Sequence, residues 1–202
     1  MSDNTAFEQI FAGAPLMAIL RGMGVERSIA VATRAWDLGI TTVEVPIQTP
    51  VDLEALEAVA SAARHRGLTV GAGTVVTPDQ VRQAKAAGAA FTVSPGLDLD
   101  VVHASQDSGL PSLPGVATPT ELERALNDGL TWVKAFPASV LSAEWFRAMR
   151  GPFPAARFVA TGGMHAGNAQ LFLAAGAEVV AVGSALEDDT QLPALSDILG
   201  TQ

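Results

Sequence analysis

Short runs of Val, Ile, Leu and Phe recur along this chain, and Ala-rich amphipathic stretches lie between them. This alternation is typical of parallel strands that are connected by helices. It predicts eight strands: Leu16–Arg21, Thr41–Val45, Thr69–Gly73, Ala90–Ser94, Ser112–Val116, Thr131–Phe136, Arg157–Thr161 and Glu178–Gly183. The 202 residues leave roughly 25 for each unit, which suffices for a strand, a helix of three turns and two tight loops.

The predicted junctions repeat the same turn chemistry. Three strand-to-helix junctions have Thr as the N-cap, Pro at the first helical position and an acid or amide at the third: Thr49-Pro50-Val51-Asp52, Thr77-Pro78-Asp79-Gln80 and Thr118-Pro119-Thr120-Glu121. At the other ends of the helices, glycine is expected in the left-handed conformation, at Gly39, Gly67, Gly88, Gly129 and Gly176.

Eight such units most economically close into a single (β/α)8 TIM barrel, an α/β fold, over residues 1–202, with 1–14 as an N-terminal segment and 187–202 as a C-terminal tail. The alternative is a doubly wound open sheet, which would have about five or six strands and a Gly-rich first turn. The segment Gly71-Ala72-Gly73 lies in the third unit and has Val76 where a dinucleotide fingerprint has its third glycine. We therefore favour the barrel.

Composition excludes several partners. The 12 Lys+Arg against 21 Asp+Glu give a net charge of −9, and no basic run marks a nucleic-acid surface. The absence of Cys excludes disulfides, thiolate metal sites and a Cys nucleophile, and it fits a cytoplasmic location. The start of the chain lacks the features of a secretory signal, and the longest apolar stretch, Leu171 to Leu186, is too short to span a bilayer. We expect a soluble protein with neither a nucleic-acid nor a membrane partner.

Lys134 is the most informative candidate for chemistry. The chain has two lysines, and the other, Lys85, is explained by a solvated helix face. The period of two along its strand places Val133 and Ala135 toward the outer helices, and Trp132, Lys134 and Phe136 toward the barrel interior. A desolvated amine loses proton affinity and becomes a usable nucleophile for a carbonyl carbon. The alternative is a structural lysine that pairs with an acid.

Two more charged residues lie near the carboxyl ends of predicted strands, where barrels of this kind hold their reactive groups. Glu44 is expected to point inward toward Lys134, where a partly dry carboxylate can move protons or serve as a counter-ion. Arg21 can hold an anion such as a substrate carboxylate, or can be an ordinary residue at the end of a strand.

The last two units indicate a phosphate site. Thr161-Gly162-Gly163 follows the seventh strand, and Gly183-Ser184 follows the eighth and begins a short helix. Glycine lets backbone N–H groups approach a phosphate, and loops after strands seven and eight commonly bind phosphate in these barrels. His65, His103 and His165 show no ligand spacing, so no metal site is expected.

Together these segments resemble the class I aldolases that cleave 2-keto-3-deoxy-6-phosphogluconate (KDPG), a family grouped with 4-hydroxy-2-oxoglutarate (KHG) and 2-keto-3-deoxy-6-phosphogalactonate aldolases. The resemblance runs from about Leu16 to Leu186 and includes Ala18-Ile19-Leu20-Arg21-Gly22, Val43-Glu44-Val45, Gly71-Ala72-Gly73-Thr74-Val75, Val93-Ser94-Pro95-Gly96, Pro114-Gly115-Val116-Ala117-Thr118-Pro119-Thr120-Glu121, Val133-Lys134-Ala135-Phe136-Pro137-Ala138 and Ala160-Thr161-Gly162-Gly163.

The resemblance implies roles for these residues. Lys134 matches the Schiff-base lysine and Glu44 the proton-shuttling acid, while Thr74 matches a threonine at the pyruvate end and Thr161 one beside the substrate. The phosphate loops match Gly162, Gly163, Gly183 and Ser184. It further implies a lyase that releases pyruvate from a phosphorylated 2-keto-3-deoxy sugar acid, a homotrimer without metal or other cofactor, and a place in carbohydrate metabolism of the Entner–Doudoroff type.

One position departs from part of the family. Gluconate-type members often have an arginine four residues after the glutamate, where this chain has Gln48 in a segment that looks more like the galactonate type. Thr161-Gly162-Gly163 looks more like the gluconate type, and Arg21 can supply the cation for the pyruvate carboxylate. We therefore expect Gln48 near the substrate and leave the epimer preference open.

Two other functions stay open at the level of sequence, because one barrel fold hosts many chemistries. One is a metal-independent sugar-phosphate isomerase or epimerase with Glu44 as its base and Lys134 as an electrostatic group. The other is a non-catalytic barrel that binds a phosphorylated metabolite. Sensitivity to borohydride separates the first from an aldolase, and aldol cleavage above background separates the second.

Overall fold

The strands of the barrel are all parallel. A computed structural model of the chain describes residues 2–12 and 15–200, and these form nine strands: β1 Leu16–Ile19, β2 Thr42–Pro46, β3 Val70–Gly73, β4 Phe91–Val93, β5 Ser112–Leu113, β6 Gly115–Val116, β7 Trp132–Ala135, β8 Arg157–Thr161 and β9 Ala177–Val182. Their order is β5-β4-β3-β2-β1-β9-β8-β7-β6. The two ends of this order, β5 and β6, are neighbours in the chain.

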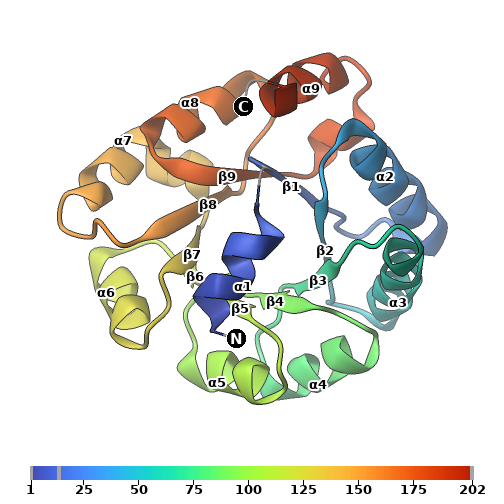
Figure 1. The fold of residues 1–202 in the computed structure, drawn as a ribbon, viewed down its shortest axis with the longest axis horizontal. Helices are drawn as coiled ribbons and strands as arrows, with labels where there is room; N and C mark the ends of the chain where they lie inside the picture. The colour runs from blue at the N-terminus through green and yellow to red at the C-terminus, as the bar shows by residue number, and fades with distance from the viewer. Residues whose placement is uncertain (1, 13–14, 201–202) are drawn as a thin grey trace.

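Pro114 alone separates β5 from β6, so the sheet curls into a nearly closed barrel (Figure 1). Ser94 donates its backbone N–H to Leu113 on one side of this proline, and Lys134 donates to Pro114 itself at 2.8 Å. The predicted strand Ser112–Val116 is thus present but interrupted, since proline has no N–H to donate to a ladder. The predicted barrel fold is confirmed, and the open doubly wound sheet is wrong.

Helices surround the barrel, and one crosses its end (Figure 1). Their bounds are α1 Asp3–Ile10, α2 Gly24–Leu38, α3 Pro50–His65, α4 Pro78–Ala86, α5 Leu99–Asp107, α6 Pro119–Asn127, α7 Ala138–Arg150, α8 Ala166–Ala175 and α9 Leu192–Gly200, with a 3₁₀ turn, η1, at Ser184–Glu187. Within the predicted tail, α9 packs against α8 and buries Leu195 and Ile198. Five positions of the predicted terminal segments, 1, 13–14 and 201–202, lie outside the described residues.

The helices begin and end as the turn chemistry predicts. Thr49, Thr77 and Thr118 are the N-caps of α3, α4 and α6, and each accepts a hydrogen bond from the third helical residue. At the other ends, Gly39 and Gly176 adopt left-handed conformations, with φ of 99° and 110°, where a side chain would be strained.

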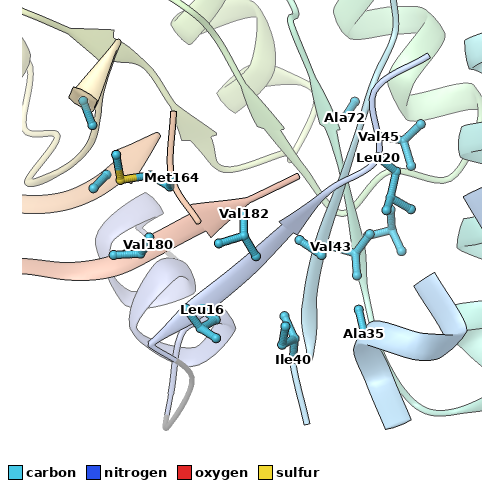
Figure 2. Close-up of a cluster of buried hydrophobic side chains, with 14 of the residues drawn as sticks. Leu16, Leu20, Ala35, Ile40, Val43, Val45, Ala72, Met164, Val180 and Val182 are labelled. Carbon is cyan, nitrogen blue, oxygen red and sulfur yellow. The ribbon is translucent and has the colours of Figure 1, made fainter. Parts of the chain in front are cut away.

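The period of two sorts side chains into two cores. Alternate residues such as Leu16, Val43 and Val180 face outward, where they meet helix residues such as Ala35 of α2 (Figure 2). The intervening residues point inward and form a second cluster: Met17, Ile19, Phe91, Val93, Leu113, Trp132, Val159, Val179 and Ala181. Val133 and Ala135 lie in the outer core and Trp132 in the inner one, as the sequence predicts.

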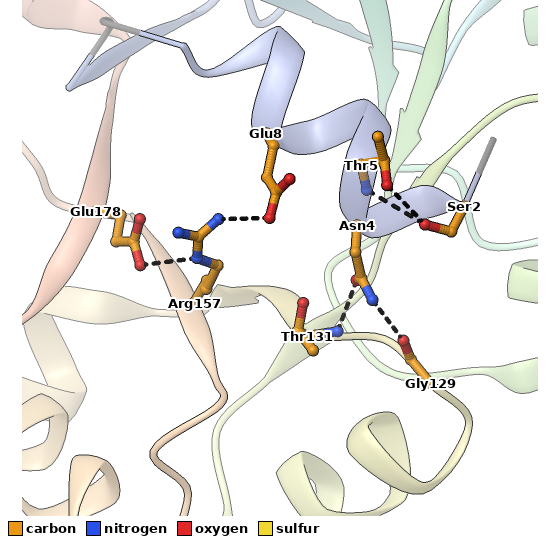
Figure 3. A network of polar contacts seen from close by, with 8 residues as sticks. All are labelled: Ser2, Asn4, Thr5, Glu8, Gly129, Thr131, Arg157 and Glu178. Carbon is orange, nitrogen blue, oxygen red and sulfur yellow. Dashed lines mark hydrogen bonds and ion pairs between the residues drawn. The ribbon is translucent and has the colours of Figure 1, made fainter.

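Helix α1 closes the end of the barrel at which the strands begin. Its Phe7 and Phe11 belong to the inner cluster, and the Phe11 ring lies 5.0 Å from that of Trp132. The guanidinium of Arg157 lies over the Trp132 ring, 4.9 Å from its centre. Arg157 also forms ion pairs with Glu8 of α1 and Glu178 of β9, each at 3.2 Å (Figure 3). The inner side of the barrel floor is therefore filled with apolar side chains, and the partly exposed ion pairs of Arg157 adjoin it.

Candidate active site

A cavity of about 580 Å³ lies at the carboxyl ends of the strands. Eight of the predicted site residues line it: Arg21, Thr74, Lys134, Thr161, Gly162, Gly163, Gly183 and Ser184. They come from the ends of five different strands, and the barrel brings them together because parallel strands end at the same edge. The other two, Glu44 and Gln48, are not among the lining residues, and Glu44 is completely buried.

Lys134 is almost completely buried, with 2% of its surface exposed, although its side chain reaches the cavity. Desolvation lowers the pKa of its amine from the usual 10.5; Glu44 opposes this shift and Arg21 reinforces it. The amine lies 5.0 Å from the centre of the Phe136 ring. A lysine in this setting has a larger neutral fraction than a solvated one, which suits it to act as a nucleophile.

Glu44 is fully buried, and neither carboxylate oxygen has a hydrogen-bond partner among residues 2–12 and 15–200. Burial raises the pKa of this carboxyl above its usual 4.5, and Lys134 and Arg21 pull it back. A buried polar group without a partner is costly, so its retention calls for a functional reason. Gly73 makes room for it, since a Cβ at position 73 would lie 2.7 Å from Oε1 of Glu44.

Arg21 lies at the rim of the cavity and is held by Gln48. Its Nη1 donates to the side-chain oxygen of Gln48 at 2.6 Å. Gln48 therefore acts on the cavity through Arg21 and does not itself line it. The pair leaves other guanidinium N–H groups of Arg21 available for an anion, because a guanidinium carries five donors.

Thr74 lines the cavity in an unusual backbone conformation. Its φ of 57° is left-handed, which is strained for a β-branched residue. The buried Ser94 supports this turn, because its hydroxyl donates to the carbonyl of Val75 at 2.7 Å. Strained backbone that surrounding contacts maintain is common at functional sites.

Two glycine turns also line the cavity. Gly162 and Gly163 follow β8 with φ of 97° and 74°, and Gly183 and Ser184 lead from β9 into η1. Thr161, the last residue of β8, is 3% exposed and lines the same cavity. These turns expose backbone to the cavity without a side chain to block it, as a phosphate site requires.

The cavity also includes residues that sequence reasoning did not single out. They are Ile19, Met23, Pro95, Phe136, Met164, Ala181 and Glu187. The predicted inward direction of Phe136 was the one available signal for this group. The sequence contains no signal for Glu187, because its position in the cavity lining depends on how η1 packs after β9.

The histidines have ordinary structural partners. His103 pairs with Asp128 at 3.0 Å, and His165 caps α8. No group of three or more His, Cys, Asp or Glu side chains within 2–12 and 15–200 is arranged to hold a metal. None of the helices that the structure describes combines the length and apolarity needed to cross a membrane.

The fold and cavity define a class: a parallel α/β-barrel enzyme with a buried lysine and glutamate below a cleft that ends in glycine turns. The family model for KDPG and KHG aldolases matches residues 7–198, and the chain belongs to this family. It is therefore an aldolase, a lyase.

Individual relatives are also named as aldolases. A 2-dehydro-3-deoxy-phosphogluconate aldolase of Treponema pallidum (strain Nichols) is 41% identical over 151 residues, which cover 74% of this chain and 71% of that protein. A probable 2-dehydro-3-deoxy-6-phosphogalactonate aldolase of Rhizobium meliloti (strain 1021) is 34% identical over 173 residues, or 85% of this chain and 81% of that one.

A solved structure is similar over almost the whole barrel. The KDPG aldolase of Legionella pneumophila, with pyruvate captured at low pH as a covalent carbinolamine intermediate, superimposes with a TM-score of 0.80 and is 31% identical, covering 94% of each chain.

Proposed function

We propose that this chain is a class I aldolase that cleaves KDPG, or its C4 epimer 2-keto-3-deoxy-6-phosphogalactonate, to pyruvate and glyceraldehyde 3-phosphate. The observation that carries the proposal is the Lys134 amine, which is buried, has a lowered pKa and lines the cavity; it interacts with Glu44, whose carboxylate accepts no hydrogen bond from the residues that the structure describes. The names of the relatives support the substrate class, and the covalent pyruvate adduct of the Legionella enzyme supports a route through a Schiff base.

In the first half of the reaction, the neutral Lys134 amine attacks the C2 ketone of the substrate. Glu44 donates a proton, directly or through water, as the hydroxyl of the carbinolamine leaves as water. A protonated Schiff base results. The raised pKa of Glu44 suits this step, because the acid then holds a proton closer to neutral pH.

In the second half, the Schiff base accepts the electrons of the bond between C3 and C4. The Glu44 carboxylate removes the proton of the C4 hydroxyl, this bond breaks, and glyceraldehyde 3-phosphate leaves. Protonation of the enamine at C3 and hydrolysis then release pyruvate and free Lys134. Covalent attachment divides one difficult cleavage into easier steps.

The lining of the cavity offers groups for both ends of this substrate. Arg21, held by Gln48, is proposed to bind the pyruvate carboxylate together with Thr74, and Thr161 to lie beside the sugar chain. The phosphate is proposed to bind the backbone at Gly162, Gly163, Gly183 and Ser184.

The cellular setting is part of the proposal. We infer a homotrimer without metal or cofactor, located in the cytoplasm and working in carbohydrate metabolism of the Entner–Doudoroff type. This rests on family membership. Sedimentation at several protein concentrations tests the oligomeric state.

The decisive experiment is borohydride reduction with and without pyruvate, followed by peptide mass spectrometry. A reduced pyruvate adduct on the peptide with Lys134, and none on the exposed Lys85, is the expected result. Lys85→Arg serves as the matched control and retains the adduct, whereas Lys134→Met loses it. An adduct on Lys85 alone, or none, would refute the Schiff-base route and favour the isomerase.

A further inference from the structure

Three consecutive carboxylates, Glu187-Asp188-Asp189, follow the turn to which we assign the substrate phosphate. Glu187 lines the cavity together with Gly183 and Ser184, and its side chain is 25% exposed. A carboxylate at this position repels a phosphate dianion through space that is partly shielded from water. A site for a phosphorylated substrate therefore needs a compensating charge.

Helix α2 supplies that charge, because η1 packs against it (Figure 1). Arg27 of α2 forms an ion pair with Glu187. About two turns further along α2, Arg34 pairs with Asp189 at 2.8 Å and donates to the carbonyl of Leu186 at 3.3 Å. Both arginines thus hold the segment after the phosphate turn.

The three carboxylates differ in what they face. Asp188 accepts hydrogen bonds from the side chains of Thr190 and Gln191, at 2.6 and 3.0 Å, and Asp189 is 81% exposed. Glu187 alone of the three lines the catalytic cavity. On its other side lies a smaller groove of about 200 Å³ lined by Arg27, Ala30, Val31 and Arg34. Glu187 therefore lies between the catalytic cavity and the groove that contains its partner, Arg27.

We propose that Arg27 is a specificity-determining residue for the phosphate of the substrate: its ion pair with Glu187 neutralises the carboxylate that would otherwise repel that phosphate. This inference rests on the proposed function, because it assumes that the phosphate binds at this end of the cavity. Arg27 acts through Glu187 and needs no contact with the substrate.

The proposal predicts effects of opposite sign for the two partners. Arg27→Ala leaves Glu187 uncompensated, so kcat/KM for the phosphorylated sugar acid should fall roughly tenfold, mainly through KM. Glu187→Gln removes the repulsion, so kcat/KM should equal or exceed that of the wild type. The double variant should return to within about threefold of the wild type, because neither charge remains.

The test needs a readout that is independent of phosphate. Exchange of the methyl protons of pyruvate with deuterated water, followed by NMR, reports the Lys134 step without any group at the distal end. The four proteins are assayed for this exchange and for cleavage of the phosphorylated sugar acid, at low and high ionic strength. Arg82→Ala is the control, because it removes one exposed arginine, which pairs with Asp79 away from the cavity.

The supporting result is a loss in Arg27→Ala that is confined to the phosphorylated substrate, shrinks at high salt and is restored in the double variant. Equal loss of cleavage and exchange would mean that Arg27 only maintains the fold, and unchanged cleavage would mean that it is irrelevant; either result overturns the inference. Failure of wild-type protein to exchange pyruvate would instead defeat the proposed function, and the inference with it.

Discussion

Replacing Gly73 with alanine should separate catalysis from stability at this site. The backbone of Gly73 needs no positive φ, so alanine can adopt its conformation. Its Cβ would lie 2.7 Å from Oε1 and 2.9 Å from Cδ of Glu44. Ordinary contact begins at 3.4 Å, so the carboxylate must retreat by about 0.7 Å, a displacement large enough to disturb proton transfer.

The expected magnitudes are unequal. A shift approaching 1 Å in a proton-transferring group costs roughly a hundredfold in kcat. The free energy of unfolding should fall by about 1 kcal/mol or less, because the obstructed atoms are the far end of a flexible side chain. The assay is pyruvate release under saturating substrate, with thermal unfolding monitored on the same samples.

Gly71→Ala provides the matched comparison, two residues earlier on the same strand. A Cβ there would collide with the ring of Phe91, which is fully buried in the barrel floor. This variant should lose about 3 kcal/mol of stability or more while each folded molecule keeps most of its activity. A Gly73→Ala enzyme with near-normal kcat would refute the role of the Glu44 carboxylate.

Three further substitutions test other parts of the site and fold. Lys134→Met should abolish turnover, measured as pyruvate release. In the wild-type enzyme, kcat/KM should rise as the pH passes through the pKa of Lys134, which lies below 10.5. Between this lowered pKa and 10.5, the lysine is protonated in the unfolded chain but neutral in the folded one, so the free energy of unfolding should rise with pH over that range. Denaturant titrations of Lys134→Met should not show this rise. Thr74→Gly should unfold at an equal or higher temperature than the wild type, because the backbone strain at a φ of 57° is relieved. Its KM for the substrate should be higher, and an unchanged KM would exclude Thr74 from substrate binding. Thr118→Ala should lower the free energy of unfolding by about 1 kcal/mol through loss of the α6 cap and leave kcat unchanged, whereas an unchanged thermal midpoint would show that the cap contributes nothing.

The sequence predicts the barrel well because its rules are local. Short apolar runs mark the strands, and β8 begins and ends at the predicted residues, Arg157 and Thr161. The interruption at Pro114 follows from the chemistry of proline. The position of α1 does not follow in this way: Phe7 and Phe11 have helical spacing, but their partners Phe91 and Trp132 lie far along the chain.

The same distinction applies to the site. The inward directions of Lys134 and Glu44 follow from strand period, so both residues could be selected from sequence. The contact between Gln48 and Arg21 joins two loops through side-chain conformations that no local rule determines. The approach of Glu187 to the cavity likewise depends on how η1 packs against α2.

The helix across the barrel floor also constrains the order of events during synthesis. Helix α1 leaves the ribosome before every strand, yet Asn4 bonds to Gly129 and Thr131, and Glu8 to Arg157 (Figure 3). Until those residues emerge, Phe11 lacks its partner Trp132, and α1 lacks the polar contacts that hold it across the floor. These contacts of the first helix can therefore form only after most of the chain has been made.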